Sequence, residues 1–111
     1  MTGPLFAGVD VGSASARVGL YDRSGRRLAF AVKPIQQFRP RHLFVEQSSE
    51  DIWGAISAAM REALSEAGAA PGDVASIGVD ATCSLVAVGE DGRPVSVAED
   101  GDPARDIVMW M

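Results

Sequence analysis

The sequence has a single cysteine, Cys83, among its 111 residues, which excludes an internal disulfide. One cysteine fits a reducing compartment, so we expect a cytoplasmic location. Long apolar runs are also lacking, and none approaches the ~20 residues that a membrane-spanning helix requires. The N-terminus lacks the charged region and long apolar stretch of a signal peptide. We therefore expect no membrane partner.

Basic residues are scarce, because 10 Lys and Arg stand against 15 Asp and Glu, for a net charge of −5. Nucleic-acid surfaces need clustered Lys and Arg, so we expect no nucleic-acid partner. The one basic cluster, Arg39, Arg41 and His42, has no alternating aromatic residues and is interpreted as a solvated loop. The rest is ordinary for a soluble globular protein, with 47% apolar and 23% charged residues.

Apolar patterning predicts four main strands and one long helix. Ser48 is expected to cap the start of the helix, with Asp51 at the capping-box spacing, and Gly68 to end it. The helix has an apolar stripe at 3.6-residue spacing, in which we expect Trp53 and Met60 to pack into the core. The strands are expected at residues 4–11, 16–21, 27–33 and 74–80.

The connections between these elements predict the topology of the sheet. Tight hairpins make the first three strands antiparallel, and the helix crosses over to place the fourth strand parallel to the first. We expect an α/β fold with a mixed sheet of order 3-2-1-4, covered by the helix on one face and bare on the other. The first strand is apolar on both sides, so one of its apolar sides would be left uncovered on the bare face. This mismatch favours a fragment of a longer chain.

The remaining segments give weaker expectations. Strands at 84–89 and 94–98 would form a small extra hairpin about the turn 90–93. A second helix would start near Pro103. The apolar ending 106–111 either packs on the domain's own core or marks a fragment, and the sequence leaves both open. Glu46 and Gln47, at the end of the long connection 34–47, are interpreted as structural residues.

The stretch 10-DVGSASAR-17 carries the chemistry. Its small residues let a ligand approach the backbone, and successive N–H groups with serine hydroxyls form a nest for phosphates. Asp10 would hold Mg²⁺ through water, and Arg17 would either neutralise phosphate or pair with an acid. The pattern matches neither the Walker A nor the G-x-G-x-x-G motif. Alone, the stretch leaves an ordinary hairpin turn equally open.

Three stretches in this order resemble the N-terminal part of the FGGY carbohydrate kinases, and a fourth, 108-VMWM-111, matches more weakly. The resemblance implies the ribonuclease H-like, actin-like ATPase fold over the whole of residues 1–111, and the third stretch looks most like the ribulokinase-type, or pentulose kinase, branch. The three stretches are 8-GVDVGSASARVGLYD-22, 45-VEQSSEDIW-53 and 77-IGVDATCSLVAV-88.

The resemblance implies a site for ATP and Mg²⁺ and a site for a sugar. Asp10 would lie near the metal, and the small residues Ala81 and Thr82 would leave room for a ketopentose or another polyol. Cys83 is otherwise expected to be a buried apolar residue. The phosphates would be bound by Gly12, Ser13, Ala14, Ser15 and Arg17, and the sugar would contact Asp80, Ala81, Thr82 and Cys83.

The leading hypothesis is the N-terminal fragment of an ATP-dependent sugar kinase that acts on a ketopentose such as ribulose. The alternatives are an ATPase module of the same superfamily, related to actin or to a chaperone, and a free-standing binding domain without catalysis. In the family the general base lies far downstream, so the fragment alone is expected to be inactive. Its bare sheet face or its tail at 106–111 is expected to self-associate.

Overall fold

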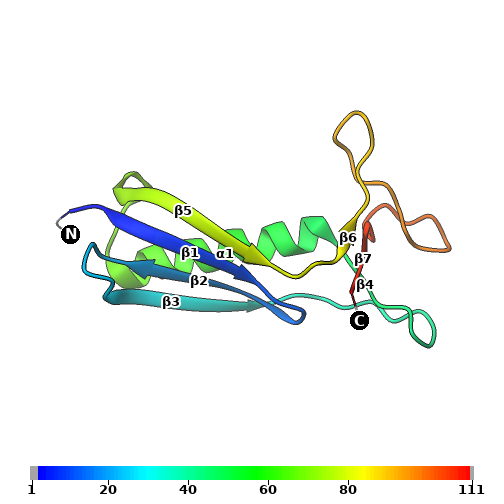
Figure 1. Ribbon diagram of the computed structural model, residues 1–111, viewed down its shortest axis with the longest axis horizontal. Coiled ribbons are helices and arrows are strands. Elements are labelled where there is room, and N and C mark those ends of the chain that lie inside the picture. Colours follow the sequence, from blue (N-terminus) through cyan, green and yellow to red (C-terminus); the bar gives the residue numbers. More distant parts are fainter. Residues whose placement is uncertain (1–2, 111) are drawn as a thin grey trace.

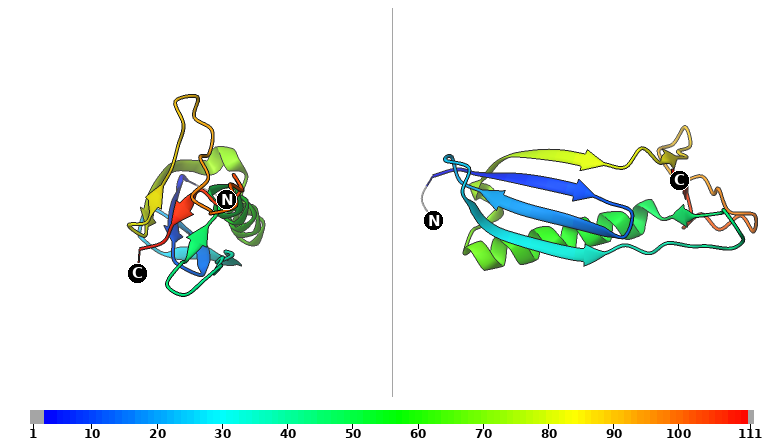
Figure 2. Two further views of the ribbon diagram at one scale, coloured as in Figure 1. Left: turned by 90° about the vertical axis from the view of Figure 1, so that its right-hand side faces the viewer. Right: turned by 60° about the horizontal axis from the view of Figure 1, so that its bottom comes forward.

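The computed structural model describes residues 3–110. The molecule is elongated, with extents of 50 × 30 × 20 Å, and a four-stranded sheet runs along its length with helix α1 on one face (Figure 1). A smaller sheet, of three short strands, lies at the end where the chain finishes (Figures 1 and 2). The main-sheet strands are β1 (Leu5–Val11), β2 (Ser15–Tyr21), β3 (Arg27–Pro34) and β5 (Val74–Ala81).

The main sheet has the order β3-β2-β1-β5. Strand β1 pairs antiparallel with β2 and parallel with β5, while β2 and β3 form the second antiparallel pair. The predicted α/β class and the order 3-2-1-4 are confirmed. Gly25, in the turn between β2 and β3, has a φ of 85°, a conformation that glycine adopts without strain.

Helix α1 (Ser49–Ala67) begins and ends where the sequence predicts. The Ser48 hydroxyl accepts a hydrogen bond from the N–H of Asp51 at 3.2 Å, and Gly68 closes the helix with a φ of 65°. The other half of the expected capping box is absent. The Asp51 carboxylate accepts instead from the N–H of Gln36, at 2.8 Å, and thereby ties the helix to the segment after β3.

The helix contacts β2 and β3 through its alanines, and a short 3₁₀ turn (Pro71–Asp73) leads on to β5. Ala55, Ala59 and Ala63 are buried and let the helix backbone approach the sheet closely. The expectation that Trp53 packs into the core is wrong, because 69% of this residue is exposed. The alanines contact the sheet, so the larger Trp53 lines an open groove between α1 and β5, whereas Met60 lines this groove and also packs, partly buried, against the core as expected.

The opposite face of the sheet is bare, as predicted, with Phe30 and Val32 exposed on β3. On β1 this face carries Phe6, Gly8 and Asp10, so the central strand is less apolar there than the sequence suggests. Within residues 3–110, no helix combines the length and the hydropathy of a membrane span.

The small sheet has the order β4-β7-β6 and contains two-residue strands. The expected hairpin of 84–89 with 94–98 is wrong in its second strand. Its turn forms, with the N–H of Gly89 bonded to the carbonyl of Arg93 at 2.8 Å and the N–H of Val95 bonded to the carbonyl of Ala87 at 3.1 Å, but the N–H of Val97 then bonds the carbonyl of Arg105 at 2.8 Å, so the pairing does not continue. The strands are β4 (Glu46–Gln47), β6 (Leu85–Val86) and β7 (Ile107–Val108).

The expected second helix near Pro103 is also wrong. The Asp102 carboxylate accepts from the N–H of Ala104 at 2.9 Å in a turn, and the chain then continues as β7. The buried Asp106 fixes this course, because its carboxylate accepts from the N–H and the hydroxyl of Ser49 at 2.8 and 2.5 Å. Of the apolar ending 106–111, residue 111 lies outside the described residues.

Candidate functional site

The loop between β1 and β2 lies at the end of the main sheet that faces the small sheet (Figure 1). The N–H of Gly12 closes the hairpin on the carbonyl of Ser15 at 2.9 Å. The carbonyl of Ala14 accepts from the N–H of Ile35 at 2.9 Å. Within residues 3–110, the N–H groups of Ser13 and Ala14 donate no hydrogen bond, so both are available to an anion.

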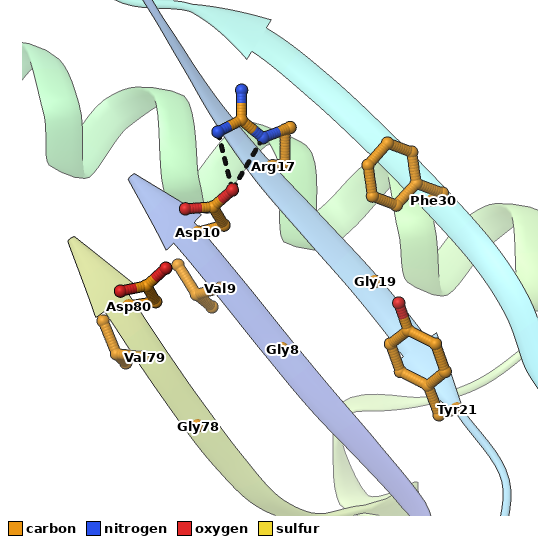
Figure 3. Close-up of a pocket in the computed structure, with 10 residues that line it drawn as sticks. All are labelled: Gly8, Val9, Asp10, Arg17, Gly19, Tyr21, Phe30, Gly78, Val79 and Asp80. Carbon is orange, nitrogen blue, oxygen red and sulfur yellow. Dashed lines mark hydrogen bonds and ion pairs between the residues drawn. The ribbon is translucent and has the colours of Figure 1, made fainter. Parts of the chain in front are cut away.

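Arg17 pairs with Asp10 on the bare face of the sheet. Its Nε and Nη2 atoms donate to Asp10 Oδ2 at 2.9 and 2.6 Å (Figure 3). Its Nη1 donates to the Ser15 hydroxyl at 2.7 Å. Arg17 was expected either to neutralise a phosphate or to pair with an acid, and in the structure it pairs with an acid. Both side chains are partly exposed, so the pair contributes at most about 1 kcal/mol to stability.

The guanidinium of Arg17 also gives a physical reason for Gly12. A Cβ atom at Gly12 would lie 2.9 Å from Arg17 Nη2 and 3.3 Å from the carbonyl oxygen of Ser15. The sequence reading attributed this glycine to the approach of a ligand. In the structure, the first group that needs the space is the side chain that pairs with Asp10.

Asp80 lies beside Asp10, because the two residues are register partners on the parallel strands β5 and β1. Both line an open cavity on the bare face, of about 520 Å³, together with Gly8, Gly19 and Gly78 (Figure 3). The sequence reading grouped Asp80 with the sugar-binding residues. Successive residues of a strand point to opposite faces, so Asp80 lies on the bare face with Asp10, and its contact with a sugar stays a prediction.

Ala81, Thr82 and Cys83 line a different pocket, of about 650 Å³. Ser13, in the loop between β1 and β2, forms part of its wall, so the candidate sugar pocket and the candidate phosphate loop share a residue. The expectation that Cys83 is buried is wrong, because it follows the end of β5 and is exposed. The rest of the wall comes from Gln37, Arg39, Met109 and Trp110.

Two glutamines at this junction were missed by the sequence reading. The side-chain amides of Gln37 and Gln47 both donate to the carbonyl of Ser13, at 2.8 and 3.0 Å. Gln47 is buried in β4, which agrees with a structural role, and its side-chain hydrogen bond goes to the loop between β1 and β2. No local pattern signals these contacts, because they join residues 24 and 34 positions apart.

The donors present fit a water-rich Mg²⁺ site. Within residues 3–110, no group of three or more His, Cys, Asp or Glu side chains forms a cage for a metal. Mg²⁺ is bound through one or two carboxylates and keeps several waters, which Asp10 and the neighbouring Asp80 would satisfy. One oxygen of Asp10 is engaged by Arg17, so its other oxygen is the one that a hydrated metal would meet.

The fold is that of the sugar kinases. The chain is similar to a gluconate kinase from Lactobacillus acidophilus, with a TM-score of 0.74 and 22% identity over 83% of this chain and 18% of that one. It is similar to a xylulose kinase from Rhodospirillum rubrum, with a TM-score of 0.74 and 20% identity over 93% of this chain and 20% of that one. At these identities the likeness shows the fold alone.

Sequence comparison identifies the family. The model of the N-terminal domain of the FGGY family of carbohydrate kinases matches residues 5–99, and the chain belongs to this family. A human FGGY carbohydrate kinase domain-containing protein is 41% identical over 96% of the chain and 19% of its own length. A D-ribulokinase of Saccharomyces cerevisiae, YDR109C, is 40% identical over 96% of the chain and 15% of its own length. The chain thus spans less than a fifth of these two relatives.

Proposed function

We propose that this chain is the N-terminal part of an ATP-dependent kinase that phosphorylates a ketopentose, with ribulose as the first candidate. The observation that carries the proposal is the junction at Ser13. A loop in which the N–H groups of Ser13 and Ala14 have no hydrogen-bond partner within residues 3–110 shares Ser13 with the pocket lined by Thr82. Phosphoryl transfer requires the phosphate and the acceptor hydroxyl to be held side by side.

In this proposal each part of the chain has a role in binding and orienting. The N–H groups of Ser13, Ala14 and Ser15 bind phosphate oxygens, with Gly12 leaving space for Arg17. Arg17 orients Asp10 and lies close enough to the loop to reach a phosphate. Mg²⁺ bound at Asp10 would supply neutralisation of the phosphate charge.

The pocket at Ala81, Thr82 and Cys83 would hold the sugar. The small side chain of Ala81 leaves room, and the Thr82 hydroxyl, 3.2 Å from that of Ser84, is placed to exchange this contact for one to a sugar hydroxyl. Transfer forms a bond from a terminal sugar oxygen to the γ-phosphorus and breaks the bond to ADP. The hydroxyl proton goes to a base that we expect in the part of the longer protein outside this sequence.

The choice of ribulose is supported by the yeast relative, which is described as a D-ribulokinase. Relatives described as glycerol kinases are also similar, at 33% identity over 92% of the chain for the Geobacter protein, so glycerol is the competing acceptor. A cytoplasmic location is part of the proposal and agrees with the single, unpaired cysteine.

The experiment is an ADP-release assay of the full-length parent with Mg-ATP and D-ribulose, D-xylulose or glycerol as the acceptor. We expect the highest kcat/KM with D-ribulose. In the parent, Thr82→Val should raise the KM for the sugar about tenfold, because a site built to bond a hydroxyl loses that bond. Ser24→Ala, in the turn at the far end of the sheet, is the matched control and should leave the KM unchanged. ATP turnover that no acceptor stimulates would refute the proposal.

A further inference from the structure

The carbonyl oxygen of Ser13 accepts hydrogen bonds from two side chains that lie far along the chain. Gln37 Nε2 donates at 2.8 Å and Gln47 Nε2 at 3.0 Å. A carbonyl oxygen has two lone pairs, so the two amides saturate it. The convergence of two glutamines on one carbonyl is notable in a loop whose adjacent N–H groups have no partner within residues 3–110.

The two glutamines differ in burial. Gln47 is 1% exposed and is held by its own strand, because β4 pairs with Ile107 of β7 and leads directly into Ser48, the helix cap. Gln37 is on the solvent-accessible wall of the sugar pocket, where water competes for the same carbonyl. Loss of the Gln47 amide therefore leaves the carbonyl without a ready substitute on its buried side, whereas loss of the Gln37 amide is made good by solvent.

The geometry of the peptide group links this carbonyl to phosphate binding. The carbonyl of Ser13 and the N–H of Ala14 belong to one planar trans peptide and point in opposite directions. A carbonyl held by the glutamines therefore directs the N–H of Ala14 away from them, into the open side of the loop. If this peptide were free to rotate, the N–H of Ala14 would no longer be held in position for an anion. Anion binding depends on donors that are already oriented before the anion arrives.

We propose that Gln47 is a positioning residue, which fixes the Ser13–Ala14 peptide so that the N–H of Ala14 is presented to a phosphate oxygen. Gln37 makes the same contact from the sugar pocket and has a minor, solvent-replaceable part. This inference rests on the proposed function, because it takes the loop to be the one that binds phosphates. It assigns Gln47 no contact with the ligand itself.

The test uses the ¹⁵N-labelled 111-residue chain, with inorganic tripolyphosphate as the probe and the amide resonance of Ala14 as the readout. Gln47→Met removes the amide donor at nearly constant size, and Gln37→Met is the matched control. We expect Gln47→Met to broaden or shift the Ala14 resonance and to weaken tripolyphosphate binding about fivefold, the equivalent of one net hydrogen bond. Gln37→Met should weaken binding less than twofold.

A second variant keeps the inference testable if Gln47→Met fails to fold. In Gln47→Glu the carboxyl group donates to the Ser13 carbonyl only when it is protonated. The Ala14 resonance of this variant should therefore move toward its wild-type position as the pH falls. An Ala14 resonance that does not return toward its wild-type position as the carboxyl group is protonated would count against the inference.

The outcomes separate this inference from the proposed function. Unchanged Ala14 resonance and unchanged binding in Gln47→Met would overturn the role of Gln47 alone. A wild-type chain that does not bind tripolyphosphate would refute the phosphate loop, and the inference with it. If the chain binds tripolyphosphate through Ala14 but the full-length parent phosphorylates no sugar, the proposed function fails and the role of Gln47 stands.

Discussion

Replacement of Asp106 by alanine should detach the end of the chain from the start of α1. Asp106 is 2% exposed, and its carboxylate accepts two hydrogen bonds from Ser49, one from the N–H and one from the hydroxyl. The N–H belongs to the first turn of the helix, where a negative charge also interacts favourably with the helix dipole. The contact joins residues 57 positions apart, so it holds the end of the chain against the start of α1.

The magnitude follows from these contacts. A hydrogen bond to a charged group is worth ~1.5–3 kcal/mol, and the two bonds share one partner residue, so their loss is not additive. We expect Asp106→Ala to lower the free energy of unfolding by about 3 kcal/mol and the Tm by about 12 °C. Asp106→Asn keeps an acceptor for the N–H of Ser49 and should lose only ~1 kcal/mol.

Urea unfolding followed by circular dichroism measures these changes. Asp91→Ala is the matched control, because this exposed aspartate also accepts from a backbone N–H, that of Arg93 at 3.0 Å, but in a solvated turn. Hydrogen exchange at the N–H of Met109, which bonds the carbonyl of Val45 at 2.9 Å, should accelerate in Asp106→Ala. A loss no larger than that of Asp91→Ala would refute the reasoning.

Two further predictions concern acid stability and association. The pKa of Asp22 lies below its ordinary value of 3.8, chiefly because the Ser24 hydroxyl donates to it. The ionised Asp22 therefore stabilises the fold above the unfolded-state pKa, and this stabilisation is lost as the pH falls through the folded-state pKa. Asp22→Asn should thus flatten the acid limb of a plot of urea midpoints against pH, and an unchanged acid limb would contradict this. The exposed edge strand β5 should associate at high concentration in sedimentation velocity, and Val79→Lys should abolish this; a wild-type monomer at every concentration would contradict it.

Local patterns predicted the framework of the fold because their causes are local. The alternation of apolar residues defined the strands, and the cap at Ser48 and the glycine at Gly68 defined the helix from contacts within a few residues. The short connections then left one reasonable sheet order. The loop at Gly12 was identified for the same reason, since a run of small residues is visible without any knowledge of its neighbours.

Misassigned elements were those whose neighbours lie far away in the sequence. Asp102 is a residue type that often caps the start of a helix. The chain instead continues as β7, because Asp106 is hydrogen-bonded to the start of α1. Trp53 shares the apolar stripe of α1, yet the smaller Ala55 and Ala59 take the sheet because they allow closer packing. Cys83 is exposed because it follows the end of β5 instead of continuing the strand.

The sequence by itself determined the four main strands, helix α1 and the order of the main sheet, because these depend on periodicity, capping and turn residues. Only the tertiary structure decided that Asp80 lies beside Asp10, while Ala81 lines a separate pocket, and that Gln47 reaches the carbonyl of Ser13. These placements depend on strand register and on contacts that span many residues. Such contacts are set by the packing of the whole chain, which no short stretch of sequence encodes.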